Sequence, residues 1–362
     1  MTGISAYIYH EDYLKYQFGP AHPFKPIREK LTLDALRRLG IFDGKAKHYE
    51  PPPASDEELL LVHSSEYIQF VEKMCKRGYG YLDLGDTPAT KSLYEGSRRV
   101  VGGTILGVKL AMDGEVSHAF NPGGGLHHAK EESASGFCVF NDVAIVVRFL
   151  QKKYGLKRIA VVDIDGHHGD GTQEILYGEP VLKISSHRAG IFPGTGYVDE
   201  LGEGAGRGYS VNIPLPRGTY DDAYLYAFKE VVKPLIEAYE PEFIVNQFGV
   251  DGHSQDPLVG LALTTKTYEE VAETMHALAH RFSQGRLLIL GGGGYNIDDS
   301  VRCWSVMFTT VSEALPEASI GDYRRLFDGE QRNENGGIFD RVKGVVEEIK
   351  ETIFPLHGLG RS

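Results

Sequence analysis

The chain has 362 residues, 41% of them hydrophobic and 24% charged, with a formal net charge of −12. This is the composition of an ordinary soluble globular protein, and the length allows a large buried core. The acidic balance, without a clustered basic stripe, argues against a nucleic-acid-binding surface. No apolar run approaches the roughly 18–20 residues that a membrane helix needs.

Three cysteines, Cys75, Cys138 and Cys303, are far apart in the sequence and odd in number. They provide neither a disulfide framework nor a CxxC metal motif, which favours a reducing compartment. Residues 1–13 have neither the basic region nor the apolar region of a secretory signal. We therefore expect a cytoplasmic protein that does not associate with membranes.

Short apolar runs alternate along the chain with amphipathic helical stretches. The predicted strands are Glu115–Phe120, Arg158–Ile164, Val181–Ser185, Phe243–Phe248 and Arg286–Leu290. The predicted helices are Tyr94–Met112, Asp142–Tyr154, Asp222–Tyr239, Tyr268–Phe282, Ser300–Val311 and Phe339–Thr352. Several strands are rich in Val and Ile without alternation, which is typical of strands buried on both faces. The pattern predicts one α/β domain over residues 1–362, with a mainly parallel sheet and helices on both faces.

Polar side chains follow the end of each predicted strand. In chain order they are His127 and His128; Asp163, Asp165, His167, His168 and Asp170; Ser185, Ser186 and His187; Asp251; and Tyr295. The carboxyl ends of parallel strands meet at one edge of an open α/β sheet, and such sheets build their sites there. Five clusters at one edge predict a functional site.

A metal site is the first prediction for this edge. Asp165 and His167 are two residues apart, so in extended chain they project to the same side. Carboxylate and imidazole suit zinc, and iron to a lesser degree. A catalytic zinc takes three protein ligands, and Asp251 is the natural third because it follows another strand. The alternatives are a helix N-cap for Asp251 and a surface turn for His167 and His168.

The adjacent histidines His127 and His128 suit acid–base chemistry better than joint ligation of one metal. Each imidazole needs an orienting partner on its far nitrogen, and Asp163 and Asp170 remain available for that role. Tyr295 follows four glycines and could donate a hydrogen bond to an oxyanion. The alternative, a phosphate-binding glycine loop, is disfavoured because GGGGYN lacks the GxGxxG and GxxxxGK[ST] forms.

These residues resemble the histone deacetylase superfamily of arginase-like fold, whose long active-site loops lie at the carboxyl edge of the sheet. The chain is most similar to the prokaryotic acetoin-utilisation-type deacetylases. The matching segments are HPFKPIREKLT (residues 22–32), NPGGGLHHAKEESASGFCVFND (121–142), VVDIDGHHGDGTQ (161–173), ISSHRAGIFPGTG (184–196), QFGVDGHSQDPL (247–258) and LGGGGYN (290–296). They follow the family order across most of the chain, and the combination is highly specific.

The resemblance implies roles for the residues already singled out. Zinc would bind Asp165, His167 and Asp251, with iron as the open alternative. His128 would be the general base and acid, and His127 would act mainly through its charge. Their partners would be Asp163 and Asp170, and Tyr295 would be the oxyanion donor. The resemblance also implies a structural potassium ion, with these ligands: Asp163, the hydroxyl of Ser185, and the carbonyls of Asp165, His167 and Ser186.

The resemblance further implies a channel for an acyl-lysine. Phe137 and Phe192 would be its aromatic walls, and Gly136 and Leu258 would complete it; without the resemblance, core packing is the ordinary interpretation of both phenylalanines. Asp86 would hold the substrate backbone at the rim and Arg28 would lie beside an internal product channel. The ordinary alternatives are a turn residue for Asp86 and an exposed helix arginine for Arg28.

Three positions depart from the family pattern. Gly166 stands between the metal ligands, where the family usually has a larger apolar residue, and we expect a looser strand end. Leu126 precedes the histidines where several eukaryotic members have a bulkier side chain, and His253 follows Asp251 at the expected rim. These departures indicate a pocket unlike that of the eukaryotic histone enzymes.

The leading hypothesis is zinc-dependent hydrolysis of N-ε-acyl-lysine in proteins, with a metabolic enzyme such as an acyl-CoA synthetase as an example of the substrate. One alternative keeps the chemistry and changes the substrate to acetylpolyamines or other small acylamines. Another is a two-manganese ureohydrolase, although the sequence DIDGHHGD differs from the DAHxD bridge of those enzymes. The non-enzyme alternative is an inactive binding module. The oligomeric state is left open.

Overall fold

The computed structural model describes residues 3–329 and 336–360. In the described residues eight strands form one sheet in the order β2-β1-β3-β8-β7-β4-β5-β6, and every neighbouring pair is parallel. The strands are β1 Ser5–Ile8, β2 Ala46–Tyr49, β3 His118–Asn121, β4 Ile159–Asp163, β5 Leu182–Arg188, β6 Ser210–Leu215, β7 Phe243–Gln247 and β8 Leu287–Leu290. The predicted parallel α/β sheet is confirmed.

The five predicted strands are β3, β8, β7, β4 and β5, and they are consecutive neighbours in the middle of the sheet. Their side chains are almost completely buried, as the Val- and Ile-rich runs predicted. The three strands that were not predicted, β1, β2 and β6, extend the sheet on its two sides. Because the predicted strands are contiguous, the polar clusters that follow them lie along one continuous edge.

The six predicted helices are present. Several are longer than predicted, and two contain a π-helical turn. The longer helices are α1 Ile27–Arg38, α3 Ser65–Arg77, α4 Leu93–Met112, α9 Thr265–Phe282, α10 Ile297–Ser312 and α12 Gly336–Thr352. The shorter ones are α2 Asp56–Leu59, α5 Asp142–Phe149, α6 Asp170–Ile175, α7 Asp221–Ala227, α8 Lys233–Tyr239 and α11 Ile320–Arg324. The predicted helix 142–154 continues from α5 into a π-helical turn, and another π-helical turn joins α7 to α8.

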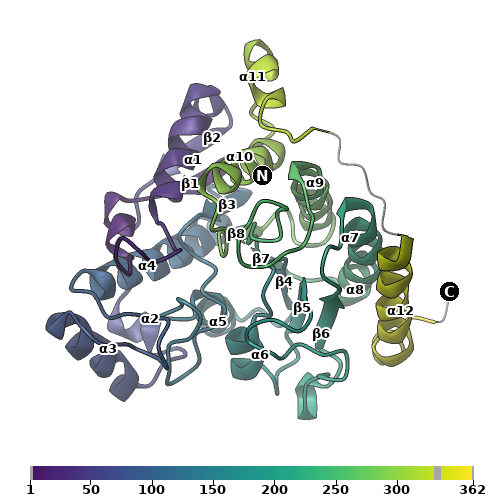
Figure 1. The fold of residues 1–362 in the computed structure, drawn as a ribbon, viewed down its shortest axis with the longest axis horizontal. Helices are drawn as coiled ribbons and strands as arrows, with labels where there is room; N and C mark the ends of the chain where they lie inside the picture. Colours follow the sequence, from purple (N-terminus) through teal and green to yellow (C-terminus); the bar gives the residue numbers. More distant parts are fainter. Residues whose placement is uncertain (1–2, 330–335, 361–362) are drawn as a thin grey trace.

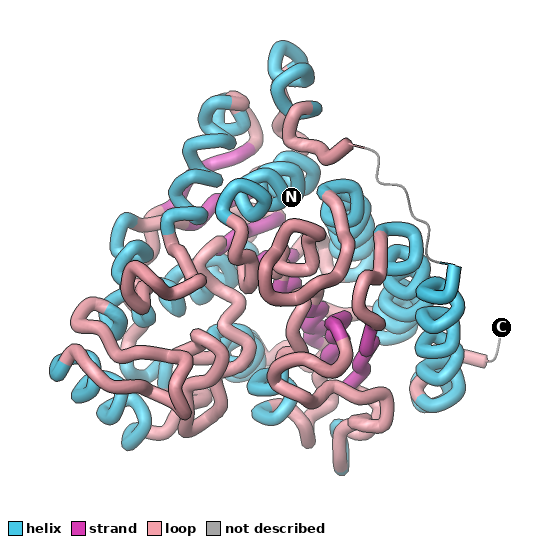
Figure 2. The backbone as a smooth tube through the Cα atoms, viewed as in Figure 1, coloured by secondary structure: helices cyan, strands magenta, loops and turns pink. Residues whose placement is uncertain are grey.

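Helices cover both faces of the sheet. Figure 1 shows α4, α5 and α6 on one side, and α1, α10, α9, α7 and α8 on the other. Helix α4 packs on β3 and β8, while α9 packs on β7 and β8. Figure 2 shows that much of the chain facing the viewer is loop. The three cysteines are free and buried. None of the helices in the described ranges has the length and hydrophobicity to span a bilayer.

Because its strands are parallel, the sheet has two distinct edges, a carboxyl edge and an amino edge. The carboxyl edge is where the strands end, and it carries the loops that contain His127, His167, Asp251 and Tyr295. The amino edge is where the strands begin, at residues such as His118 of β3 and Leu287 of β8, which are paired in register. The two edges therefore lie at opposite ends of the same strands.

Candidate active site

Asp165, His167 and Asp251 meet at the carboxyl edge. One potential ligand atom from each lies within 4.8 Å of the others, and all three residues are buried. The Nδ1 atom of His167 is 2.8 Å from Asp251 Oδ2 and 3.3 Å from Asp165 Oδ1. His168 is buried as well, so the surface-turn interpretation is wrong. Two carboxylates and one imidazole form a donor set that suits a divalent metal.

Hydrogen bonds hold the two carboxylates in place. Asp165 Oδ2 accepts from the Gln247 side-chain amide at 2.8 Å and from the Gly293 backbone N–H at 2.7 Å. Asp251 Oδ1 accepts from the Gly166 N–H at 2.7 Å. Bonds of this kind orient metal ligands and tune their affinity. Gln247 was not predicted to have a role, although it ends β7 only four residues before Asp251.

The two histidines His127 and His128 each bind an aspartate through Nδ1. Asp163 Oδ2 is 2.7 Å from His127 Nδ1, and Asp170 Oδ1 is 2.7 Å from His128 Nδ1. The two predicted His–Asp pairs are therefore present. The Nε2 atoms of the two rings are 3.0 Å apart. With Nδ1–H donated to the aspartate, Nε2 of His128 keeps its lone pair and can accept a proton.

The surroundings shift the pKa values of the two imidazoles in opposite directions. Burial lowers the pKa of His127, but the Asp163 and Asp165 carboxylates outweigh it and bring that pKa to about 9. Burial, with His127 beside it, lowers the pKa of His128 to about 4. A charged His127 and a neutral His128 match the predicted division between an electrostatic residue and a base.

Tyr295 belongs to the loop after β8, and its side chain lies near the predicted metal ligand His167. Its ring lies 6.5 Å from the His167 ring and 5.8 Å from the Phe137 ring, centroid to centroid. Its backbone N–H donates to Asp256 at 2.8 Å, which fixes the loop. Burial and the carboxylates of the metal-ligand group raise the pKa of the Tyr295 hydroxyl well above its usual range. The hydroxyl is thus a neutral hydrogen-bond donor.

Arg28 lies behind this loop, and the ordinary alternative, an exposed helix arginine, is wrong; its place beside a product channel stays a prediction. It is 1% exposed. Its guanidinium donates to the carbonyl oxygens of Gly292 at 2.7 Å and Gly294 at 2.5 Å, and lies over the Trp304 ring. A small cavity is lined by Gly292 and Tyr295 of this loop and by Leu126, His127 and His128, among others. Arg28 is not among its lining residues. The observed role of Arg28 is to hold the Tyr295 loop.

A cavity of about 280 Å³ leads to these groups. It is lined by Asp86, His128, Gly136, Phe137, His167, Ile191, Phe192, Leu258 and Tyr295. The four predicted channel residues are all present in this set. Phe192 is 44% exposed, so ordinary core packing does not explain it. Ile191 is the wall residue that the sequence did not indicate.

The backbone at Gly136 and Phe137 shapes this wall. Both residues have positive φ, 52° and 67°. A Cβ atom on Gly136 would lie 2.5 Å from the His128 ring and 2.8 Å from the Phe192 ring, so only glycine fits. Phe137 is held by its N–H donating to Thr87 and by its carbonyl accepting from Tyr16. Unusual φ values held by surrounding contacts are common at functional sites.

Asp86 lies at the cavity entrance, beside Asp83. The Thr87 hydroxyl donates to both carboxylates, at 3.1 Å to Asp86 and 2.5 Å to Asp83. Burial and the neighbouring Asp83 raise the pKa of Asp86 to about 6. A wider depression of about 630 Å³ adjoins the entrance, lined by residues 83–86, Lys130, 133–135 and Phe192. Asp86 is thus both a turn residue and a rim carboxylate.

Three of the residues predicted for potassium, Asp163, Ser185 and Ser186, lie together on β4 and β5. Asp163 of β4 and Ser185 of β5 are partners in register. The Ser186 hydroxyl is 3.4 Å from the Asp163 carbonyl oxygen and 2.6 Å from the Tyr224 hydroxyl, while the Ser185 hydroxyl is 2.9 Å from His187 Nδ1. Oxygen donors are concentrated here, and potassium as the ion stays a prediction.

Two expectations about the family departures are wrong. His253 is buried rather than at the rim, with Nε2 3.0 Å from Asp328 Oδ2. The strand end at Gly166 is filled rather than loose, because a Cβ atom there would lie 2.5 Å from Val259. Val259 occupies the space that a larger residue at 166 would need. Leu126 is buried and lines the small cavity beside the two histidines.

Known proteins resemble this chain over most of its length. Residues 22–311 match the histone deacetylase domain. The acetoin utilization protein AcuC of Bacillus subtilis is 41% identical over 312 residues, which cover 83% of this chain and 80% of that protein. A probable deacetylase of Archaeoglobus fulgidus is 40% identical over 355 residues, 97% of each chain. The crystal structure of the HDA15 HD domain has a TM-score of 0.82 at 28% identity, covering 98% of this chain and 96% of that one.

Proposed function

Because the chain belongs to the histone deacetylase family, we propose that it is a zinc-dependent deacylase that hydrolyses the amide of N-ε-acyl-lysine in proteins. The similar proteins support deacetylase activity. The observation that carries the finer proposal is the convergence of three kinds of group on one narrow cavity. These are the metal-ligand group, the two His–Asp pairs and the Tyr295 hydroxyl.

Zinc suits the donor set of Asp165, His167 and Asp251, and iron is the alternative that the same donors would accept. Such an ion, once bound, would polarise a carbonyl group and lower the pKa of water. The hydrogen bonds from Gln247 and from two backbone N–H groups hold the carboxylates ready for it. Potassium at the oxygen-rich region around Asp163 and Ser185 belongs to the same proposal.

His128 moves the protons of the reaction. Its Nε2 accepts a proton from the attacking water as the water oxygen bonds to the acyl carbon. The same imidazolium then donates that proton to the lysine nitrogen as the C–N bond breaks, so one group serves as base and then as acid. Asp170 holds the ring and its tautomer throughout, at 2.7 Å from Nδ1. His127, charged beside Asp163, contributes a fixed positive potential.

Tyr295 stabilises the negative charge that develops on the carbonyl oxygen. It is a buried neutral donor fixed by Asp256 and Arg28, so little reorganisation is needed when the charge forms. Phe137 and Phe192 flank the cavity and exclude water around the lysine stem. Excluding water strengthens each of these electrostatic interactions.

A protein substrate is favoured by the shape of the entrance. The narrow cavity accommodates a side chain, and the adjoining depression of about 630 Å³ could receive the polypeptide on either side of it. The carboxylates of Asp83 and Asp86 at this rim could accept backbone N–H groups. An acylated metabolic enzyme, such as an acyl-CoA synthetase, in the cytoplasm is the substrate that we propose. Acetylpolyamines would use the cavity but leave the depression unfilled.

Replacement of Tyr295 by phenylalanine tests this assignment. Tyr295→Phe removes one hydroxyl and leaves the ring, so kcat on an acetyl-lysine peptide should fall by about 100–1,000-fold, as it does when an oxyanion donor is lost. Tyr197→Phe is the matched control, because Tyr197 is 51% exposed and lies outside the cavity lining. It should retain full activity.

Unchanged turnover by Tyr295→Phe would contradict the role of this hydroxyl. The substrate is tested separately with a panel of acetyl-lysine peptides and acetylpolyamines on zinc-loaded protein. A higher kcat/KM for acetylpolyamines would replace protein lysine by small acylamines and leave the chemistry in place. Two manganese ions bound together at the carboxyl edge of an active chain would instead favour the ureohydrolase alternative.

A further inference from the structure

Three histidines meet at the amino edge of the sheet, away from the site described above. His118 is the first residue of β3, and its partner in register is Leu287, the first residue of β8. His276 and His280 belong to the last two turns of α9, the helix that packs on β8. The catalytic groups follow the other ends of these strands, so the two histidine groups lie at opposite ends of the sheet.

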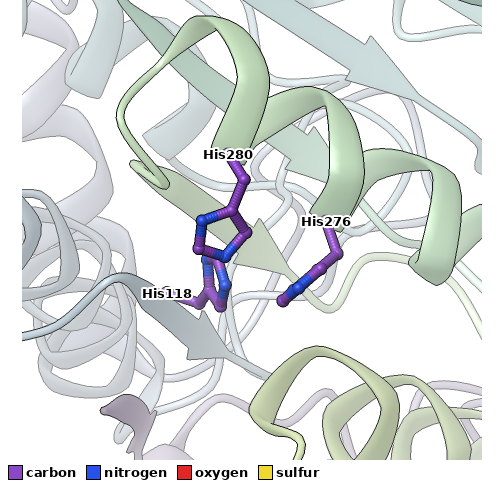
Figure 3. A group of neighbouring side chains, drawn as sticks. All are labelled: His118, His276 and His280. Carbon is purple, nitrogen blue, oxygen red and sulfur yellow. The ribbon is translucent and has the colours of Figure 1, made fainter. Parts of the chain in front are cut away.

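Figure 3 shows the three rings converging between β3 and α9. One ring nitrogen from each lies within 4.8 Å of the others. The ring centroids are 4.8 Å apart for His118 and His276, 5.1 Å for His118 and His280, and 4.5 Å for His276 and His280. His276 and His280 are four residues apart, so they project from the same face of the helix. Strand β3 supplies the third ring, His118, which lies against that face of the helix.

Two nitrogens of this group are buried without a hydrogen-bond partner among the described residues. They are Nδ1 of His118 and Nδ1 of His276. An unpaired buried polar atom is costly, by about 1–3 kcal/mol, and native structures rarely leave one without a ligand, water or ion. Two such atoms in one cluster of three imidazoles leave ring nitrogens available to a ligand or a water molecule.

Two of the rings, His118 and His276, have surroundings that favour the neutral form, which binds a metal. Burial, with His276 and His280 beside it, lowers the pKa of His118 to about 3. Burial and His280 also lower the pKa of His276. A neutral imidazole offers a nitrogen lone pair to a cation, and no proton has to leave first. Three packed imidazoles therefore favour a metal ion over an anionic ligand, which would need them protonated.

A carboxylate lies at the outer side of the cluster. Oε1 of Glu313 is 3.8 Å from Nε2 of His276, and the other oxygen of Glu313 is 3.7 Å from Lys45 Nζ. The Glu313 side chain is 63% exposed, so it can reorient toward an ion. Three imidazoles and one carboxylate or water would complete a tetrahedral set.

We propose that His118, His276 and His280 form a second metal site, which binds a divalent first-row transition cation of the zinc type. Imidazole nitrogen is a preferred ligand of zinc, copper, nickel and cobalt, whereas magnesium and calcium require oxygen. The ion would join the end of α9 to the start of β3. Its role is to stabilise the fold, because the cluster lies at the opposite end of the strands from the cavity.

The test counts metal ions on the full chain. Wild-type protein is loaded with Zn²⁺, passed through gel filtration, and analysed for zinc per chain. The test variant is His276→Gln/His280→Gln, and the matched control is Glu273→Gln, an exposed charge change on the same helix. We expect the double variant to hold one zinc fewer per chain than wild type and the control to hold the same number. His167→Gln, which alters the other metal-ligand group, should leave this difference in place.

Two further measurements make the test independent of activity and of folding. Co²⁺ bound at a tetrahedral nitrogen-rich site gives visible absorption bands, and these should persist in His167→Gln and disappear from the double variant. Zn²⁺ should raise the melting temperature of His167→Gln, because binding to the native state stabilises it. If the double variant fails to fold, His280→Gln alone, at an exposed position, should weaken zinc binding in a chelator competition.

Equal zinc content in wild type and the double variant, or equal competition by His280→Gln, would overturn the proposal. The cluster would then be a packed group of histidines without a ligand. Failure of the proposed function would look different, because it would appear as wild-type protein without deacetylase activity or as undiminished zinc binding at the carboxyl edge of His167→Gln. The difference in zinc content between wild type and His276→Gln/His280→Gln does not depend on either of these results.

Discussion

The two histidine-containing groups at the ends of the sheet have similar ligand spacing and different surroundings. Each brings three potential metal ligands within 4.8 Å of one another. At the carboxyl edge two ligands are carboxylates, their second oxygens are fixed by hydrogen bonds, and a cavity opens beside them. At the amino edge all three are imidazoles packed ring against ring between a strand and a helix.

This difference indicates what makes a metal site catalytic. Ligand type and spacing determine whether an ion can bind, and both groups meet that condition. Reaction also needs a proton acceptor, an oxyanion donor and access for substrate; these are the roles that we propose for His128, Tyr295 and the cavity at one edge. The amino edge offers ligands between packed elements, which is the arrangement of a structural site.

The largest expected difference comes from removing one histidine at each edge. His128→Gln removes the proposed proton acceptor, so kcat/KM on an acetyl-lysine peptide should fall by about 100–10,000-fold. His280→Gln changes a residue at the far end of the strands and should leave kcat/KM unchanged in zinc-loaded protein. Steady-state kinetics on both variants measures the contrast. A comparable loss in His280→Gln would mean that the two edges are coupled.

A smaller effect is expected from the hydrogen bonds that support the catalytic ligands. Gln247→Leu keeps the volume of the side chain but removes its donor to Asp165 Oδ2. We expect zinc affinity at the carboxyl edge to fall by about 10–100-fold. Chelator competition measures it, with Gln151→Leu as the control because the side-chain amide of Gln151 donates to Glu179, outside the metal-ligand group. Unaltered affinity would show that the bond contributes packing alone.

The sequence was informative where a residue type and a strand end coincided. The predicted metal ligands follow strands whose Val- and Ile-rich cores could be recognised, and the parallel arrangement then brought His127, Asp165 and Asp251 together. Length does not explain the missed outer strands, because the predicted strands β3 and β8 also have only four residues each. The sequence of β2 is AKHY, which is largely polar and partly exposed, and β6 contains Pro214, so neither has the continuous apolar run of a buried strand.

Other features depended on contacts between distant segments. Arg28 looks like an ordinary helix arginine until α1 packs against the Gly292–Gly294 loop, 264 residues later. The cluster at the amino edge joins His118 to a helix more than 150 residues away, and neither segment alone predicts a site. The fit of Gly166 to Val259 is likewise a matter of side-chain volume, which a sequence pattern does not report.

The smallest expected effect concerns that fit, and it probes how rigid the catalytic edge is. A Cβ atom on residue 166 would lie 2.5 Å and 2.6 Å from the two Cγ atoms of Val259, a buried and stiff side chain. Gly166→Ala should therefore lower the free energy of unfolding by about 1–3 kcal/mol. Val259→Ala makes room for the new methyl group, so Gly166→Ala/Val259→Ala should lose less than the sum of the single variants.

Urea unfolding of the four proteins of this cycle measures the coupling, which should be about 0.5–3 kcal/mol for residues in direct contact. At the amino edge the exposed His280 has no such constraint, and His280→Gln in metal-free protein should change the free energy of unfolding by less than about 0.5 kcal/mol. Additive losses for Gly166 and Val259 would mean that the strand end relaxes around an added methyl group. The tight packing of the carboxyl edge would then come from the hydrogen bonds to Asp165 and Asp251 rather than from volume.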